Sequence, residues 1–281
     1  MSVVGGGTKL IFCEGQPGSL DNRLLNRLLL GQPPSTLIVP SGGKRGLLAF
    51  IQGRLSSYAA RPAHLAFRDR DYDRVPSEDE ALIRLRPNTP VFLSYRAAVE
   101  NYLLDASLVH DYWDTNRSEA PSWQYGDSPG ADQIAEWMDD AARTLVHYQA
   151  VRWSLAGLKP AERWPELETT WTKGSGFLPE SLDEGDCLAE AKKLVSEYTG
   201  SASEVREAKL VENYQQFAEQ FAAPGFLRAP QYLIWFHGKD LCKAMHRLRP
   251  TWVSLYHYCS WAVDRLERER YADLRELATM I

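Results

Sequence analysis

The chain has 281 residues, a formal net charge of −5, and a composition that is 44% apolar and 25% charged. Such a chain is long enough for about two domains, and its composition excludes a disordered or fibrous protein. The first residues lack the basic start and apolar core of a secretory signal, and no apolar run has the length of a membrane span. Four scattered cysteines do not form a disulfide framework. We therefore expect a cytoplasmic protein.

The first hundred residues alternate between short apolar strands and amphipathic helices. The expected strands are "KLIFCEG", "STLIVPSGG", "HLAF" and "PVFLSY". The expected helices are "SLDNRLLNRLLLG", "KRGLLAFIQGRLSSYA" and "RAAVENYLLD". Strict alternation of this kind predicts an α/β, Rossmann-like fold with a mostly parallel sheet and flanking helices.

The rest of the chain is predicted to be helical. Residues 112–130 are rich in Pro, Gly, Ser and Asp and lose all periodicity, which is typical of a linker or a functional loop. Beyond them, long stretches such as "QYLIWFHGKDLCKAMHRL" and "SLYHYCSWAVDRLERERYADLRELATMI" have the pattern of continuous helices. The expected organisation is an α/β domain over 1–111, a linker over 112–130 and a C-terminal helical domain over 131–281.

An acidic stretch follows the third expected strand. In "HLAFRDRDYDRVP", an extended chain would place Asp69, Asp71 and Asp73 on one side, with arginines on the other, because side chains alternate with period two. The first strand ends at Glu14, followed by Gly15. In a parallel sheet these carboxylates would meet at one edge, where they could bind Mg²⁺. The alternative is a surface ladder of weak ion pairs.

A glycine turn, "PSGGKRG", follows the second expected strand. Gly42 and Gly43 allow close backbone approach and Lys44 supplies a cation, which together suit a phosphate. Neither this turn nor "GGGTK" has the spacing of a nucleotide-binding P-loop, so we expect no nucleotide site in this chain. Residues 40–99 hold ten Lys and Arg against six Asp and Glu, a cationic region in an acidic protein that could attract a polyanion.

Several of these motifs, taken in order, resemble a known family. "CEG" with Glu14, the "PSGGK" turn, "FRDRDYD" and "SYRAAVENYLLD" with Glu100 are similar to a TOPRIM domain. Within that group the chain resembles the nucleases related to the overcoming-lysogenization-defect family, and is most similar to the AriB family, the effector subunits of the PARIS anti-phage defence system. The likeness covers residues 9–105 and continues more faintly at "HGKDL", where Lys239 is an accessory candidate.

The resemblance implies roles for individual residues. Glu14 would be a general base or metal ligand, Asp69 and Asp71 would hold Mg²⁺, and Lys44 would face the scissile phosphate. Glu100 would be a further acidic ligand or its support. Arginines interleave the acidic pair, unlike the usual pattern, so whether Asp71 or Asp73 binds the metal stays open. Mn²⁺ is an alternative ion.

The resemblance also implies a function and partners. We expect a metal-dependent endonuclease, a hydrolase of phosphodiester bonds, with RNA and especially tRNA as its substrate. It would be the toxic effector of an antiviral, abortive-infection system, controlled by an AriA-like ABC-type ATPase. Homodimerisation is left open, and no membrane association is expected.

Two rival interpretations come from other classes of protein. "DYDRV" also fits the signature of haloacid-dehalogenase-type phosphatases, with Asp71 as nucleophile and Asp73 as acid. That nucleophile should end the first core strand, whereas two strands precede it here. The second rival is a non-catalytic, TOPRIM-like module that only regulates an ATPase.

Overall fold

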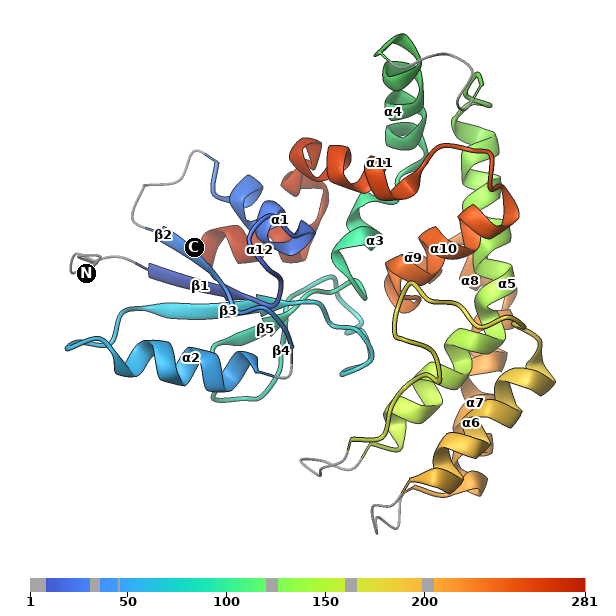
Figure 1. Ribbon diagram of the computed structural model, residues 1–281, viewed down its shortest axis with the longest axis horizontal. Coiled ribbons are helices and arrows are strands. Elements are labelled where there is room, and N and C mark those ends of the chain that lie inside the picture. Colours follow the sequence, from blue (N-terminus) through green and yellow to red (C-terminus); the bar gives the residue numbers. More distant parts are fainter. Residues whose placement is uncertain are drawn as a thin grey trace. The chain divides into compact units, whose positions relative to one another are not determined.

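The structure is a computed structural model, shown in Figure 1. It describes residues 9–30, 36–44, 46–119, 126–159, 166–198 and 205–280. The chain forms two compact units. Unit 1 consists of Met1–Arg70, Pro76–Leu103 and His257–Ile281, and unit 2 consists of Asp71–Val75 and Leu104–Tyr256. Each unit is therefore built from segments that are separated in the sequence.

Unit 1 contains a five-stranded sheet with the order β2-β1-β3-β5-β4. Its strands are β1 (Lys9–Cys13), β2 (Thr36–Pro40), β3 (His64–Arg68), β4 (Ile83–Arg84) and β5 (Val91–Leu93). The first three and β5 pair in parallel, and β4 is antiparallel at one edge. Cys13 pairs with Pro40 on one side and with Phe67 on the other. The carboxyl ends of β1, β2 and β3 therefore lie along one edge.

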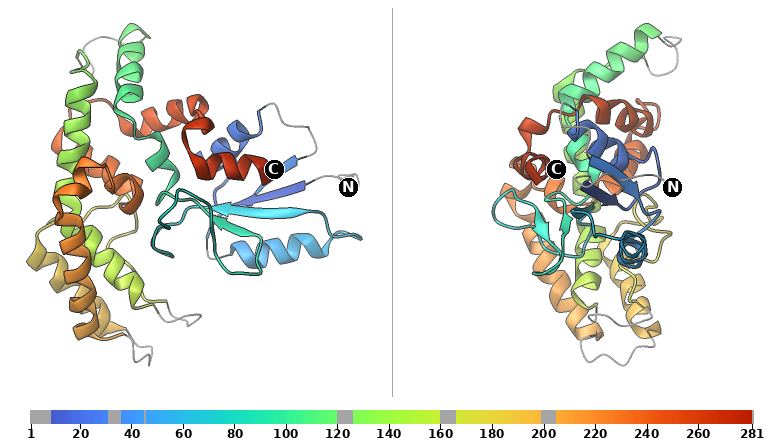
Figure 2. Two further views of the ribbon diagram at one scale, coloured as in Figure 1. Left: turned by 180° about the vertical axis from the view of Figure 1, so that it is seen from behind. Right: turned by 90° about the vertical axis from the view of Figure 1, so that its left-hand side faces the viewer.

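Helices cover both faces of this sheet. Helix α2 (Leu47–Ser56) lies on one face, while α1 (Leu20–Leu28) and α12 (Ala272–Met280) lie on the other (Figures 1 and 2). The alternation of β1 explains the two layers, because Leu10 and Phe12 pack in one core cluster with Leu47 and Ile51 of α2. Unit 1 also contains α3 (Val99–Leu103) and the short helical turns η1 (Val263–Arg265) and η2 (Arg268–Arg270).

Among its described residues, unit 2 contains helices and loops but no strand. Its helices are α4 (Ala106–Glu119), α5 (Ala131–Gly157), α6 (Glu184–Glu197), α7 (Glu207–Ala222), α8 (Pro224–Arg228), α9 (Tyr232–Trp235) and α10 (Gly238–Leu248). Helix α5 is the centre of the unit and packs against α4, α6, α7 and α10. Aromatic rings fill the space beside it, with Trp153 of α5 next to Phe217 and Trp235.

The predicted sheet and its helical flanks are confirmed, but the predicted linker is partly wrong. Residues 112–119 belong to α4, and 120–125 lie outside the described residues. The polar composition of this stretch did not reveal that two of its aromatic residues, Tyr112 and Trp113, are buried. The Trp113 indole donates to the carbonyl of Gly126 at 3.1 Å. The unit boundaries also differ from the expected domains, since 257–281 belongs to the unit that holds the sheet.

Two predicted continuous helices are interrupted. Helix α9 ends at Trp235, and His237 caps the start of α10 by accepting a hydrogen bond from the backbone of Lys239. The C-terminal stretch divides into α11 (Leu255–Ala262), the two short turns and α12. Periodicity alone did not reveal these breaks, because the residues on either side of each break are helical and amphipathic.

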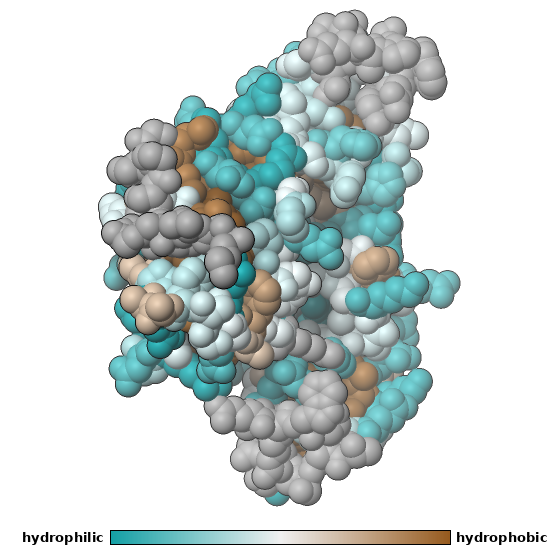
Figure 3. Space-filling model, turned by 60° about the vertical axis from the view of Figure 1, so that its left-hand side comes forward, coloured by the Kyte–Doolittle hydropathy of each residue, from teal (hydrophilic) through white to brown (hydrophobic). Residues whose placement is uncertain are grey.

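Several large apolar side chains are exposed on the surface. Figure 3 shows a mostly hydrophilic face with scattered apolar patches. In unit 1, the large apolar side chains exposed to solvent include Leu37 on β2 and Leu48 and Phe50 on α2. Within the described residues, no helix combines the length and apolar character needed to cross a membrane.

Candidate functional site

Glu14 lies at the carboxyl edge of the sheet, directly after β1. Because Cys13 pairs with Phe67, Glu14 is level with Arg68, and the two side chains share a face. Arg68 Nη1 donates to Glu14 Oε1 at 3.3 Å. Glu14 thus lies at the carboxyl edge of the sheet, beside Arg68, a cation that the sequence analysis had considered only in the surface-ladder alternative.

Asp69 directly follows β3, the strand next to β1. Its Oδ1 accepts a hydrogen bond from the backbone nitrogen of Val99 at 3.0 Å, at the start of α3. Glu100, the next residue of α3, is buried with only 7% of its surface exposed. A hydrogen bond therefore joins Asp69 directly to the first residue of α3, and the buried Glu100 is the second residue of that helix.

The glycine turn after β2 contacts the end of β1. The backbone nitrogen of Ser41 donates to the carbonyl of Cys13 at 2.9 Å, and that of Gly42 donates to the carbonyl of Gly15 at 3.1 Å. Gly42 has a φ of +84°, a conformation that glycine adopts without strain. Gly43 is exposed and Lys44 is half-buried at the far side of the turn. The turn that was predicted to bind phosphate therefore lies beside the chain that carries Glu14.

Sequence analysis missed Asp21, in the first turn of α1. Its Oδ2 accepts a hydrogen bond from the backbone nitrogen of Gly15 at 2.6 Å, and its Oδ1 accepts one from the Ser19 hydroxyl. Asp21 also contributes, after burial, to raising the pKa of Cys13 to about 12. The signal was present in the sequence, because an acidic residue early in a helix that follows a glycine loop is a common backbone cap.

The predicted alternation of Asp69, Asp71 and Asp73 is wrong. Strand β3 ends at Arg68, and Asp71 has a φ of +48°, so the chain turns where an extension was expected. Arg70 explains the turn, because it is fully buried and its Nε donates to the carbonyl of Tyr95 at 3.1 Å. The surface-ladder alternative is also wrong for Arg68 and Arg70, since both are buried.

The carboxylates do not gather into a large cluster. Across the described ranges, no group of three or more His, Cys, Asp or Glu side chains could hold a metal ion. Glu14, Asp69 and Glu100 belong to unit 1, whereas Asp71 and Asp73 belong to unit 2. The predicted acidic set is therefore divided between the two units.

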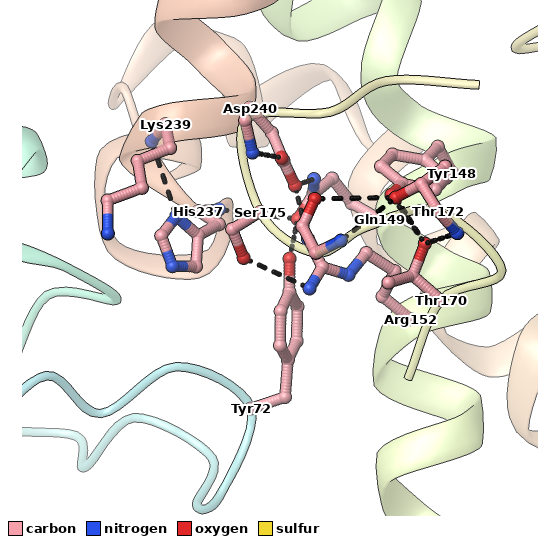
Figure 4. A network of polar contacts seen from close by, with 12 residues as sticks. Tyr72, Tyr148, Gln149, Arg152, Thr170, Thr172, Ser175, His237, Lys239 and Asp240 are labelled. Carbon is pink, nitrogen blue, oxygen red and sulfur yellow. Dashed lines mark hydrogen bonds and ion pairs between the residues drawn. The ribbon is translucent and has the colours of Figure 1, made fainter. Parts of the chain in front are cut away.

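The segment Asp71–Val75 contacts a buried polar network inside unit 2 (Figure 4). The Tyr72 hydroxyl donates to Gln149 Oε1 at 2.7 Å, and Gln149 Nε2 donates to Asp240 Oδ2 at 2.8 Å. Arg152 Nη1 forms an ion pair with the same oxygen at 2.5 Å, and the backbone nitrogen of Gly176 donates to Asp240 Oδ1 at 2.7 Å. Asp240, which is fully buried, is thus satisfied by donors on both oxygens.

His237 connects this network to Asp71. Its Nε2 lies 3.0 Å from Asp71 Oδ1, its Nδ1 lies 3.2 Å from the backbone nitrogen of Lys239, and its own backbone nitrogen donates to Gln149 Oε1 at 3.3 Å. The Lys239 side chain is exposed, so its backbone makes the contact with His237. The accessory candidate Lys239 is thus two residues from a histidine that contacts Asp71.

Burial controls the ionisation of the network. Burial raises the pKa of Tyr72 well above its usual value, with Arg152 opposing and Asp240 adding to the effect. Burial alone would lower the pKa of Arg152, but Tyr72 and Asp240 raise it overall. The Arg152 guanidinium lies 4.3 Å from the centre of the Tyr72 ring, a cation–π contact. The network therefore contains a permanent cation beside a neutral phenol.

Sequence analysis also missed Gln149 and Arg152. Both lie on the buried face of α5, three residues apart, in the stretch "VHYQAVRWSLAG". Polar residues at core-facing positions of an amphipathic helix usually have a buried partner. The signal was therefore present, although the partner Asp240 could not be identified from spacing.

The comparisons with known proteins add no family assignment. No protein-family model matches the chain, and a search of curated proteins finds no significant match.

Proposed function

We propose that this protein is a metal-dependent endonuclease of the TOPRIM type, acting on RNA and within that class on tRNA. In the cell it would be the toxic effector of an anti-phage system, kept inactive by a partner ATPase. One observation carries the catalytic part of the proposal: Glu14 and Asp69 follow the carboxyl ends of two adjacent parallel strands. Ligand sites in open α/β sheets occur at this edge.

The chemistry of the donors fits Mg²⁺ or Mn²⁺. Magnesium is commonly held by only one or two carboxylates, with substrate phosphates and water completing its shell, so a cage of three protein ligands is not required. Glu14 and Asp69 would hold the ion in unit 1, and the resemblance adds Asp71, Asp73 and Glu100 as candidates. When bound, the ion would polarise the phosphate and lower the pKa of an attacking water.

The chain's own residues would position the substrate. Glu14 is the group that would accept a proton from the attacking water. Gly42 and Gly43 would let the phosphate approach the backbone, and Lys44 would pair with its charge. Arg68 already forms an ion pair with Glu14, so it would compete with the metal ion for that carboxylate.

A second candidate function is a non-catalytic module that regulates an ATPase. The observation that favours it is the Arg68–Glu14 ion pair, which already neutralises the carboxylate that catalysis needs. In this case Glu14 would stabilise the fold by joining β1 to β3, and it would not act on a substrate.

The deciding experiment is cleavage of total tRNA and of plasmid DNA by the purified protein with Mg²⁺, Mn²⁺ or a chelator. We expect metal-dependent cutting of tRNA by the wild type and loss of cutting in Glu14→Gln and Asp69→Asn, with unchanged thermal unfolding. The same reaction is repeated with the proposed partner ATPase, because a latent effector would cut only after its partner is triggered. Failure to cut under all of these conditions would contradict the nuclease and favour the regulatory module.

A further inference from the structure

Asp71 is held in an unusual backbone conformation. Its φ of +48° lies in the left-handed region, which is uncommon for non-glycine residues, although Asp adopts it more readily than most. The next residue, Tyr72, is buried, and its hydroxyl is bonded inside unit 2. The Tyr72 hydrogen bond therefore helps to fix the turn that presents the Asp71 carboxylate, together with the buried Arg70 that precedes it.

The hydrogen bonds of His237 define the role of each ring nitrogen. Nδ1 accepts from the backbone N–H of Lys239, so this nitrogen carries no hydrogen. Nε2 is then the nitrogen that carries the hydrogen, and it donates to Asp71 Oδ1 at 3.0 Å. This hydrogen bond fixes the direction of the Asp71 carboxylate.

Gln149 links Tyr72, which follows Asp71 in the chain, to His237, which contacts the Asp71 carboxylate. Its Nε2 donates to Asp240, so its Oε1 must be the acceptor for both the Tyr72 hydroxyl and the His237 backbone. The buried Arg152–Asp240 ion pair fixes the amide in turn. Tyr72, which follows Asp71, and His237, which contacts Asp71, are thus both held by the Gln149 side chain. Figure 4 shows these three residues.

We propose that His237 is a positioning residue for Asp71, and that Asp71, in preference to Asp73, is the functional carboxylate of this segment. The inference rests on the nuclease function proposed above, in which the segment after Asp69 supplies an acidic group. His237 does not touch the substrate. It acts by fixing the direction of the Asp71 carboxylate, and the Tyr72–Gln149 hydrogen bond fixes the turn that carries it.

The first test uses metal-free protein and does not depend on activity. Nitrogen-15 NMR of the six histidines at one pH is compared between wild type and variants, with His237→Phe identifying the signal. We expect His237 to be protonated at Nε2 only. Asp71→Gly, which suits the left-handed conformation but removes the carboxylate, should shift the Nε2–H signal, and Asp73→Ala should not. Protonation at Nδ1, or a signal indifferent to Asp71→Gly, would overturn the inference.

The second test is a double-mutant cycle on tRNA cleavage. We expect His237→Phe to lower kcat about tenfold with KM changed less than about twofold, and His237→Gln, which keeps an N–H donor, to recover most of the loss. In an Asp71→Asn background, adding His237→Phe should cost less than about twofold, whereas in Asp73→Asn the full loss of about tenfold should remain. Thermal unfolding of each variant confirms folding.

The two tests separate two kinds of failure. An equal loss in both aspartate backgrounds would make His237 a purely structural residue and would refute the positioning role. A wild type that cuts no nucleic acid with any metal or partner would refute the nuclease, while the NMR comparison would still decide whether His237 orients Asp71.

Discussion

Arg68 donates to Glu14 across the boundary between two adjacent parallel strands, with 8% and 18% of the two side chains exposed. The pair places a cation on the carboxylate that the nuclease proposal assigns to metal binding and proton transfer. A divalent ion would have to compete with Arg68 for that carboxylate. The strength of this competition can be measured.

Replacing Arg68 with an apolar side chain of similar length should strengthen metal binding. We expect Arg68→Met to raise the affinity for Mn²⁺ by about three- to tenfold, because a partly buried ion pair contributes on the order of 1 kcal/mol. Isothermal titration calorimetry of the metal-free protein measures the effect. Arg68→Lys keeps the charge and should bind the metal nearly as wild type does. Weaker binding by Arg68→Met would show that Arg68 supports the site.

Gly15 should not tolerate a side chain. A Cβ there would lie 2.0 Å from Ser19 Oγ and 2.2 Å from Asp21 Oδ1, so the start of α1 would have to move. We expect Gly15→Ala to lower the free energy of unfolding by about 1 to 3 kcal/mol in urea titrations. Gly43→Ala is the matched control for stability, because nothing lies within 4 Å of its Cβ. Equal stability of the two variants would contradict the prediction.

The buried Arg152–Asp240 pair should be more costly to break than to replace. We expect Asp240→Ala to lower the free energy of unfolding by about 3 to 5 kcal/mol, since it leaves a buried guanidinium uncompensated. The double variant Asp240→Leu with Arg152→Met should lose clearly less, because no isolated charge remains. Denaturant unfolding of the single and double variants measures both values. A double variant as unstable as the sum of the singles would contradict this account.

Asp273 should make stability depend on pH in the acidic range. Burial raises the pKa of this carboxyl above its usual value of 3.8, although it accepts hydrogen bonds from the Tyr102 hydroxyl and the Tyr95 backbone. The protonated form is therefore favoured by folding, so its contribution is present below the unfolded pKa and is lost as pH rises through the folded pKa.

The comparison with Asp273→Asn isolates that contribution, because all other groups cancel. The stability of wild type minus that of the variant should fall as pH rises from the usual pKa of an aspartate through the raised pKa of the folded state, and then stay constant. Urea unfolding at successive pH values measures this difference. A difference that rises with pH would mean that the hydrogen bonds outweigh burial and that the pKa of Asp273 is lowered.

The local hydrophobic pattern of the sequence was enough to predict most strands and helices of the first hundred residues. The strands β1, β2, β3 and β5 and the helices α1, α2 and α3 were expected where they occur. Strand β4 has only Ile83 and Arg84, which is too short to show a period. Glu14 and Asp69 were found because the end of an apolar strand can be identified in sequence. The parallel sheet then places both residues at one edge.

Other features of the structure depend on contacts between residues that are far apart in the sequence, and local patterns could not predict them. The Asp71 carboxylate bonds to His237, which is 166 residues away in sequence. The placement of 257–281 in unit 1 depends on contacts such as the hydrogen bond from the Tyr271 hydroxyl to the Tyr102 carbonyl, 169 residues away. A single sequence has no periodic signal for such pairings, so the strand alternation was extended past Arg68 and the C-terminal segment was assigned to the helical domain.

The segmented units limit how this gene can be dissected. The backbone passes between units at residues 70–71, 75–76, 103–104 and 256–257, so no single cut yields either unit as an uninterrupted polypeptide. The hydroxyl of Tyr258 bonds to the carbonyl of Leu103, so the excursion over 104–256 leaves and re-enters unit 1 at neighbouring points. A fragment for expression would therefore be an internal deletion closed by a short linker. Even then, residues 71–75 would be retained without the buried partners that surround them.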